Sequence, residues 1–187
     1  MLYFTKSPSA ALAECGTEGV AAKTAKTRGP AVSLPEKSSK SRARSLPPLL
    51  EVHQSAVHGR GVYAITRIPK GKRIIEYKGK VVPWMQASPQ ADGPHTFLFG
   101  LTNGKDVIDP EGGGNEARWI NHSCEPNCEA IEEGHRVFIY ALRSLPPGQE
   151  LFYDYGLEVD EPRTASLEKE YECRCGSPRC RGTLLGR

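Results

Sequence analysis

The sequence has no long apolar run and no basic leader in front of one. Residues 1–4 carry no basic side chain, and the apolar run at residues 10–13 is too short for a signal peptide or a membrane span. No segment repeats elsewhere in the chain. These absences predict a cytoplasmic protein with no membrane partner, or one that is exported by a route leaving no such mark.

Aromatic side chains are missing from residues 5–48, which are rich in Ser, Ala, Lys, Thr and Pro. Such a segment buries too little apolar surface to offset the entropy of ordering, so we expect residues 1–48 to form a disordered extension. This extension is also the basic part of the chain. Residues 1–50 hold eight Lys and Arg against three Glu, a net charge of +5. Residues 51–187 hold 17 Lys and Arg against 19 Asp and Glu, a net charge of −2.

The charged residues at 37–44 predict a weak contact with nucleic acid or with an acidic partner, or a nuclear address. The alternative is a plain solvated linker. The mildly acidic remainder suits a basic peptide better than DNA, because DNA binding depends on neutralising phosphates.

Short runs of β-forming residues separated by turns make up the rest of the chain, beginning near Pro48. This pattern is typical of a β-rich domain, so we expect a mainly β fold with short helices. Residues 84–95 should form an irregular insert with a short helix, and residues 164–171 another short helix. The expected strands are residues 51–55, 62–65, 73–77, 96–101, 106–109, 136–141 and, as the last one, 150–153.

One stretch, residues 118–128, is dense in polar side chains that can bind metals or ligands. The apolar pair Trp119 and Ile120 leads into Asn121, His122 and Ser123. The Cys-Glu-Pro-Asn that follows indicates a bend, since Pro fixes φ and Asn tolerates turn geometry. A ligand site at the bend and a polar loop beside the core both fit this run taken alone.

Cysteines cluster near the C-terminus at Cys173, Cys175 and Cys180. Three thiolates are one short of a closed tetrahedral zinc site, and Cys124 is the natural fourth ligand. A disulfide is the alternative, but a Cys-x-Cys pair spans too little backbone to form one easily. We therefore predict a structural zinc that ties the bend to the end of the chain. Cys128 competes with Cys124 as a ligand or is a plain thiol.

Four motifs occur in a fixed order along the chain. They are Gly-Arg-Gly-Val-Tyr-Ala at 59–64, Glu-Tyr-Lys-Gly at 76–79, the stretch at 118–127, and Glu-Leu-Phe-Tyr-Asp-Tyr-Gly at 150–156. A Cys-x-Cys-x4-Cys-Arg-Gly sequence follows them. From about residue 50 onward the chain resembles SET-domain protein-lysine methyltransferases with a post-SET zinc motif. It has no long pre-SET cysteine array, and in this it is similar to the short bacterial members.

The resemblance implies a SET domain at residues 49–157 and a post-SET zinc segment at residues 158–187. It implies a pseudoknot, in which the C-terminal segment passes through a loop. The implied activity is transfer of a methyl group from S-adenosylmethionine to a lysine in a basic protein, a histone or histone-like tail. We expect a monomer in the bacterial cytoplasm, associated with the nucleoid; the alternative is the chromosome or nucleus of a host.

In the resembled family the Gly-x-Gly turn lies along S-adenosylmethionine, which assigns Arg60, Gly61 and Val62 to cofactor binding. A dinucleotide-binding fold would need a third glycine and a following helix, and a strand is expected here instead. Asn121 and His122 hold the cofactor in the family. Phe97 stands where many members have a Tyr, so it keeps the packing and loses the hydroxyl contact.

The resemblance makes Tyr155 the catalytic tyrosine, which also contacts the cofactor. It places Tyr153 where product methylation is tuned and Tyr77 in the wall of the lysine channel. A lysine, with a pKa of about 10.4, must lose its proton before attack, and an aromatic channel disfavours the ammonium form. Leu184 and Leu185 are expected to cover the channel rim.

Two other functions fit the same sequence. One is a catalytically silent SET-fold module that binds peptides. The other is a zinc-bearing nucleic-acid binder that uses the basic extension.

Overall fold

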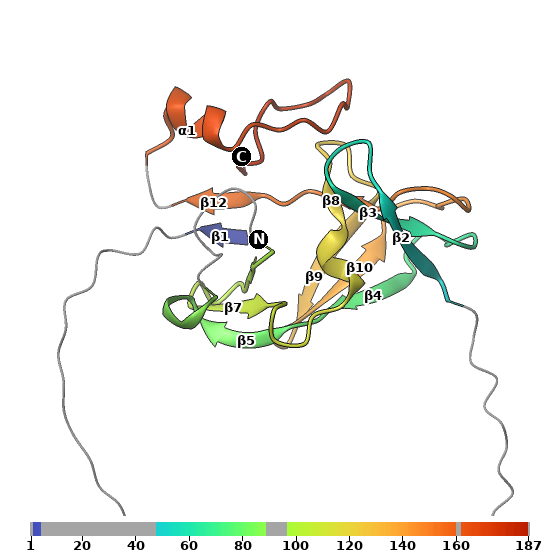
Figure 1. Ribbon diagram of the computed structural model, residues 1–187, viewed down its shortest axis with the longest axis horizontal. Helices are drawn as coiled ribbons and strands as arrows, with labels where there is room; N and C mark the ends of the chain where they lie inside the picture. Colours follow the sequence, from blue (N-terminus) through green and yellow to red (C-terminus); the bar gives the residue numbers. More distant parts are fainter. Residues whose placement is uncertain (1, 5–47, 89–96, 160–161, 187) are drawn as a thin grey trace, which may run out of the picture. The chain divides into compact units, whose positions relative to one another are not determined.

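The computed structural model describes residues 2–4, 48–88, 97–159 and 162–186 (Figure 1). The segment at 37–44 lies outside these residues, so the nucleic-acid contact stays a prediction. At the start of the expected extension, residues 2–4 belong to the same compact unit as the described residues from 48 onward. Within it, Leu2–Phe4 form strand β1, consistent with three apolar, β-favouring residues in an otherwise polar segment.

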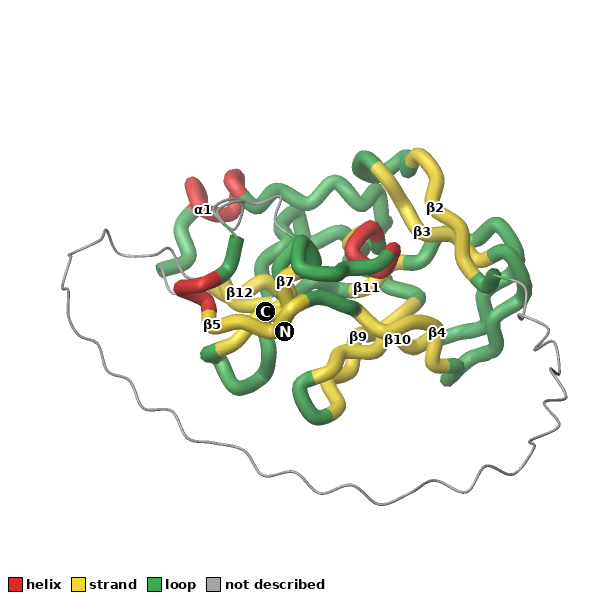
Figure 2. The backbone as a smooth tube through the Cα atoms, turned by 60° about the horizontal axis from the view of Figure 1, so that its bottom comes forward, coloured by secondary structure: helices red, strands yellow, loops and turns green. Residues whose placement is uncertain are grey.

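The described part of the chain is β-rich with one short α-helix, as predicted. Its helix is α1 (Ala165–Glu170), and two 3-10 turns are η1 (Trp84–Gln86) and η3 (Glu116–Trp119). Figure 2 shows the short strands separated by long loops. The strands are β1 (Leu2–Phe4), β2 (Leu50–Gln54), β3 (Arg60–Ala64), β4 (Arg73–Tyr77), β5 (Lys80–Pro83), β6 (Phe99–Gly100), β7 (Asp106–Asp109), β8 (Asn121–His122), β9 (Cys128–Glu133), β10 (Arg136–Ala141), β11 (Phe152–Tyr153) and β12 (Leu157–Val159).

These strands form small sheets with the orders β4-β10-β9, β5-β7-β6, β2-β3, β11-β8 and β1-β12. The central strand β10 buries Val137, Phe138 and Ile139 in succession, as expected of a strand covered on both faces. Val137 pairs with Tyr77 in the antiparallel register of β10 and β4. The register therefore fixes Tyr77 at the end of β4, close to the centre of the molecule.

The parallel pair β8 and β11 joins the polar stretch at 118–128 to the motif at 150–156. Phe152 pairs with Asn121, and Tyr153 pairs with His122. Asn127 is fully buried beside this pair. Its Nδ2 donates to the Glu150 carbonyl at 2.7 Å, and its Oδ1 accepts from the Phe152 N–H at 2.8 Å. A buried amide paired on both sides locks the two segments together, since breaking either bond would leave an unsatisfied polar group.

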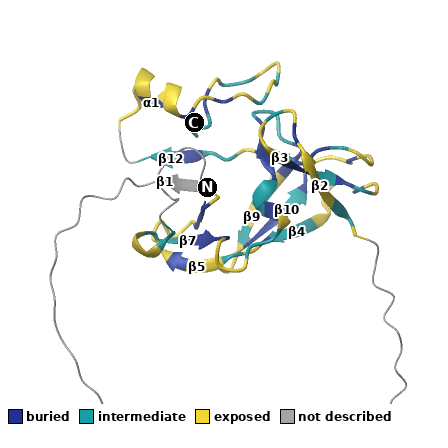
Figure 3. Ribbon diagram, viewed as in Figure 1, coloured by how far each residue is buried: buried dark blue, intermediate teal, exposed yellow. Residues whose placement is uncertain are grey.

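The main apolar core runs through the domain and into the C-terminal segment. Figure 3 shows where the buried residues lie along the chain. Val62 and Leu151 have no exposed surface, and Leu167, Tyr171 and Leu185 join the same cluster from beyond residue 158. Thr164 caps α1 by accepting the Leu167 N–H at 3.2 Å, which confirms the predicted helix and directs Leu167 inward. The C-terminal segment and the residues before it thus pack around the same apolar core.

Several elements differ from the expected ones. The strand predicted at 150–153 is confined to Phe152–Tyr153 and is not the last, because β12 follows it. Strand β9 was not predicted, since its Glu-rich sequence resembles a loop; antiparallel pairing with β10 holds it. Of the insert at 84–95, η1 is observed, and residues 89–96 lie outside the described range. No helix among the described residues is long and apolar enough to cross a membrane. The predicted threading of a pseudoknot stays a prediction.

Candidate active site

A cavity of about 470 Å³ lies between the turn at residues 57–60, strand β8 and the C-terminal segment. Its volume is within the range of pockets that hold small ligands. The lining includes five residues predicted to bind the cofactor: Arg60, Phe97, Asn121, His122 and Tyr155. Two other predicted residues, Gly61 and Val62, do not line it and are buried in β3 behind the turn. Leu184 lines the cavity, whereas Leu185 belongs to the core.

Asn121 shapes the cavity wall by holding the turn that precedes β3. Its Nδ2 donates to the carbonyl of Arg60 at 2.8 Å and lies 3.2 Å from the carbonyl of His58. Glu150 Oε1 accepts from the same nitrogen at 3.1 Å. The amide N–H groups are therefore committed to the protein, and Asn121 acts by fixing the backbone that a ligand would meet.

Glu150 is a buried carboxylate that sequence reasoning missed. It accepts from Asn121 and, at 2.8 Å, from the Tyr63 hydroxyl, whose pKa is raised by burial and by this carboxylate. A Cβ built on Gly61 would lie 2.1 Å from Glu150 Oε1 and 2.7 Å from its Cδ. The glycine at position 61, which the resemblance assigned to cofactor binding, leaves room for the Glu150 side chain.

Gly61→Ala is expected to lower the free energy of unfolding by about 2 kcal/mol, because the new methyl group would displace a carboxylate held by two hydrogen bonds. Denaturant unfolding measures the loss. The matched test is the double variant with Glu150→Asp, whose shorter side chain relieves the clash. The loss in free energy of unfolding for the double variant should then be smaller than the sum of the losses for the two single variants. A Gly61→Ala protein as stable as the parent would contradict the contact.

His122 connects the tyrosine motif to the cysteines. Its Nδ1 accepts the backbone N–H of Tyr155 at 3.0 Å, so the ring proton is assigned to Nε2. Nε2 lies 3.3 Å from Cys124 Sγ and donates to it. Burial lowers the pKa of His122 to about 4, against the opposing effect of Asp154. The imidazole is therefore neutral near pH 7 and acts as a fixed spacer between Tyr155 and Cys124.

Four aromatic rings form a cluster beneath the cavity: Tyr77, Phe99, Tyr153 and Tyr155. Successive ring centroids are 5.3, 6.2 and 4.9 Å apart. Only Tyr155 lines the cavity; the side chains of Tyr77 and Tyr153 are buried behind it. The structure thus brings the three predicted tyrosines together and adds Phe99, which the sequence did not single out.

The hydroxyl groups of two tyrosines are fixed by backbone carbonyls. Tyr155 donates to Ile120 at 2.9 Å, and Tyr77 donates to Phe97 at 2.5 Å. Burial raises the pKa of Tyr77, Tyr153 and Tyr155, so all three remain neutral at ordinary pH. Because the Tyr155 proton points at Ile120, the lone pairs of its oxygen are left for other contacts.

Arginines and aromatic rings make up a second wall of the cavity. The guanidinium carbons of Arg60 and Arg118 lie 4.8 and 4.7 Å from the Trp119 ring, and the Phe97 ring lies 4.9 Å from it. Arg118 Nε is buried without a hydrogen-bond partner among the described residues. A buried unpaired N–H on a cationic group suits an anionic ligand. The sequence reasoning had assigned no role to Arg118.

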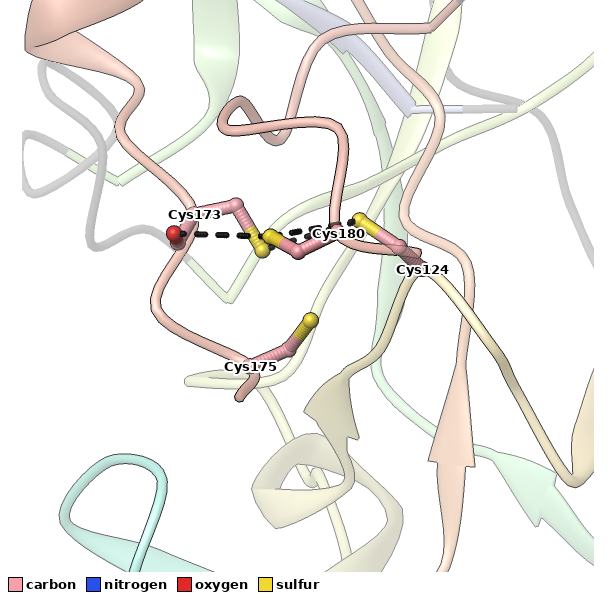
Figure 4. Close-up of side chains that lie close together, drawn as sticks. All are labelled: Cys124, Cys173, Cys175 and Cys180. Atoms are coloured by element: carbon pink, nitrogen blue, oxygen red, sulfur yellow. Dashed lines mark hydrogen bonds between the residues drawn. The ribbon is translucent and has the colours of Figure 1, made fainter. Parts of the chain in front are cut away.

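The four predicted zinc ligands, Cys124, Cys173, Cys175 and Cys180, lie together (Figure 4), and Cys173 and Cys175 also line the cavity. Their sulfur atoms are all within 4.8 Å of one another, with Cys124 at 3.7 Å from Cys173 and 4.0 Å from Cys180. Zinc–sulfur bonds of about 2.3 Å in a tetrahedron place the sulfurs about 3.8 Å apart. The cluster is therefore compatible with a zinc site.

The structure also bears on the two alternatives to this zinc site, a disulfide bond and Cys128 as a ligand. All five cysteines that the structure describes are free thiols, and separations near 4 Å are far longer than a disulfide bond. Cys128 is fully buried outside the cluster, and burial raises its pKa to about 12. Burial also opposes ionisation of Cys175, but hydrogen bonds from Cys124, Ser177 and the neighbouring thiols lower its pKa to about 7. Burial raises the pKa of Cys124 and Cys173 instead, so these two thiols would ionise when a metal replaces their protons.

Arg181 links the cysteine cluster to the tyrosine motif. Its backbone N–H donates to Cys124 Sγ at 3.3 Å, and its guanidinium binds both oxygens of Asp154, at 2.5 and 2.8 Å. Burial opposes ionisation of Asp154, but Arg181 outweighs it and holds the pKa of this carboxyl below its usual value. Arg181 thus joins the C-terminal segment by an ion pair to Asp154, the residue between Tyr153 and Tyr155.

The family model described as "SET domain" matches residues 59–156, which include the turn before β3, strand β8 and the tyrosine motif. The chain belongs to the SET domain family. This SET domain chain is 35% identical over 142 residues to "Histone-lysine N-methyltransferase 2B" of Homo sapiens, covering 71% of the chain and 5% of that protein.

Two further relatives are similar to the chain over comparable lengths. "Histone-lysine N-methyltransferase ash1" of Drosophila melanogaster is 34% identical over 157 residues, 79% of the chain and 7% of the relative. "Histone-lysine N-methyltransferase, H3 lysine-4 specific" of Chaetomium globosum is 38% identical over 141 residues, 70% of the chain and 13% of the relative. The chain therefore spans a small part of the length of each of these three relatives.

Proposed function

We propose that this SET domain chain is an S-adenosylmethionine-dependent protein-lysine N-methyltransferase that acts on a basic protein of the histone or histone-like class. The position of Tyr155 carries the proposal: it is the one member of the aromatic cluster that reaches the cavity. It stands between a wall suited to an anionic ligand and buried rings suited to a lysine stem. The names of the relatives support histone as the substrate class.

SET methyltransferases use S-adenosylmethionine, which supplies an activated methyl group. The cavity residues fit this ligand. Arg118, with its buried unpaired Nε, would hold the carboxylate, and Trp119 would offer a flat apolar face. His122 and Asn121 keep that wall rigid, because each is hydrogen-bonded to backbone on another segment.

The aromatic cluster would prepare the lysine. Buried rings disfavour the charged ammonium group and so favour the amine that attacks. Tyr155 directs its proton to the Ile120 carbonyl, which leaves its oxygen to accept weak C–H···O contacts from a polarised methyl group. The rigid packing of these rings would also hold the amine in line, which supplies catalysis through proximity.

We further propose that Cys124, Cys173, Cys175 and Cys180 bind one structural zinc ion. Four thiolate ligands leave no open position for a substrate, so the metal would have no direct part in the chemistry. Cys173 and Cys175 also line the cavity, so the folded zinc segment would form one of its walls.

The test is transfer of a labelled methyl group to a mixture of histones and other basic proteins, followed by mass spectrometry of the modified lysines. Label on lysine supports the proposal. Binding of basic peptides without any transfer of label would favour the silent peptide-binding module. Salt-sensitive binding to DNA that disappears when residues 1–48 are removed would favour the nucleic-acid binder.

Tyr153→Phe is expected to raise the proportion of di- and trimethyl-lysine while leaving the first transfer nearly unchanged. A second transfer requires the methylated nitrogen to rotate, and the Tyr153 hydroxyl can hold a water in the needed space or bond the nitrogen itself. One lost hydrogen bond changes the relative barriers by about 1 kcal/mol, or about fivefold in rate. A time course of product masses on one peptide measures this. A parent enzyme that already reaches trimethyl-lysine would contradict the role.

A further inference from the structure

Strand β12 has two edges, and one of them is paired with the C-terminal segment. The Leu157 N–H donates to the Leu184 carbonyl at 3.2 Å, and the Leu157 carbonyl accepts the Gly186 N–H at 2.8 Å. Successive residues of a strand direct their backbone groups to opposite sides. The backbone groups of Glu158 therefore face the other edge, which begins directly after Tyr155 and Gly156.

That second edge is occupied by β1, from the other end of the chain (Figure 1). The pairing is parallel, with Leu2 opposite Leu157, Tyr3 opposite Glu158 and Phe4 opposite Val159. Strand β1 also contacts β6, which contains Phe99 of the aromatic cluster. The N-terminal strand thus contacts two strands that adjoin the proposed lysine site.

We propose that Leu2–Phe4 is a displaceable strand that competes with the protein substrate for the edge of β12. The proposal rests on the proposed function, because it assumes that a peptide must reach Tyr155. A strand edge binds an extended segment through backbone hydrogen bonds, which do not depend strongly on its side chains. One extended segment can therefore replace another at this edge.

The sequence of β1 makes it a competitor and not an acceptor. Leu2, Tyr3 and Phe4 contain no amine in their side chains, so the strand fills the edge without offering a lysine. The parallel direction means that a segment in the same position leads, on its N-terminal side, back toward Gly156 and Tyr155. A substrate bound there would pass the aromatic cluster.

The pairing is also short enough to be displaced. It has three residue pairs, so few backbone hydrogen bonds have to break for β1 to leave, while the C-terminal segment still holds β12 from its other edge. Because β1 is part of the same chain, its competition does not depend on protein concentration. The apparent affinity for the substrate is reduced by the fraction of molecules in which the edge is free.

The kinetic test compares the full chain with the variant Leu2→Pro/Tyr3→Pro/Phe4→Pro, whose β1 segment has no backbone N–H to donate. The matched control places the same three prolines at Ala11, Leu12 and Ala13. The β1 variant should show an apparent KM for a histone peptide about fivefold lower, as expected if the edge is free about one fifth of the time. Its kcat should stay within about twofold, because saturating substrate displaces β1. An unchanged KM, or an equal fall in the control, overturns the proposal.

Amide hydrogen exchange provides a readout that needs no methyl transfer. Exchange of the Glu158 amide, which faces β1, should be about fivefold faster in the β1 variant than in the parent and the control, since its pairing with β1 is lost. Exchange of the Leu157 amide, which donates to Leu184, should not change. Faster exchange in the β1 variant supports the pairing of β1 with the edge of β12, whether or not any protein is methylated. A lack of methyl transfer would count against the proposed function alone. Equal exchange in all three proteins overturns the proposal.

Discussion

Tyr155→Phe is expected to lower the rate of the first methyl transfer by about 100-fold, equivalent to about 2.7 kcal/mol in the barrier. Phenylalanine keeps the ring contacts with Tyr153 and His122 and removes only the oxygen. Its loss frees the ring from the Ile120 carbonyl, so the ring no longer has one fixed position. It also removes the acceptor for the weak methyl contacts.

Single-turnover kinetics on one peptide measure the chemical step separately from product release. The control is Tyr140→Phe, because Tyr140 also uses its hydroxyl in hydrogen bonds, to Arg73 and Glu133, on the exposed side of β10. We expect the control to retain the parent rate and the Tyr155 variant to retain peptide binding. A fall in the single-turnover rate of less than about threefold would contradict a catalytic role for Tyr155, since the loss of one ordinary hydrogen bond has an effect of that size.

The sequence predicted the parts of the fold that carry a clear local signal. Strand β10 combines successive β-branched and aromatic residues, and α1 follows a capping threonine, so both were visible locally. Strands β8 and β11 have two residues each and carry no periodic signal. They exist because the Asn127 hydrogen bond to Phe152 and the parallel register join residues 25 and 152 − 121 = 31 positions apart, which no local pattern reports.

The candidate site was predictable to the same extent. The cysteine spacing and the polar stretch suggested which side chains meet, because each motif is short and chemically specific. Glu150 was missed, since its partners Tyr63 and Asn121 are 87 and 29 residues away and a lone Glu in a strand looks exposed. Arg118 was missed as a ligand-binding residue, because only the folded chain reveals that its Nε is buried and has no hydrogen-bond partner among the described residues.

Cys124→Ser is expected to abolish zinc binding and, with it, binding of S-adenosylmethionine. Cys124 Sγ is the point where three parts of the site meet: it accepts from His122 Nε2 and from the Arg181 N–H, and it adjoins Cys173. A serine oxygen is a poorer zinc ligand than a thiolate and its bond is shorter. Because a structural metal is coupled to folding, the segment that holds the other three cysteines should become disordered.

That disorder would open the cavity. Cys173, Cys175 and Leu184 line it, and Arg181 would no longer hold Asp154 beside Tyr155. We therefore expect both the zinc content and the binding of labelled cofactor to fall by at least about tenfold in one substitution. Metal analysis by mass spectrometry and equilibrium binding of the cofactor measure the two losses on the same sample.

The matched control is Cys128→Ala, because Cys128 is a fully buried thiol outside the cluster. It should lose some stability, about 1 kcal/mol from the small cavity, and keep one zinc per chain. A parent protein purified without chelator that contains no zinc would contradict the metal site. A Cys124→Ser protein that loses its zinc and still binds the cofactor as the parent does would contradict the coupling, because the C-terminal wall of the cavity would then fold without the metal.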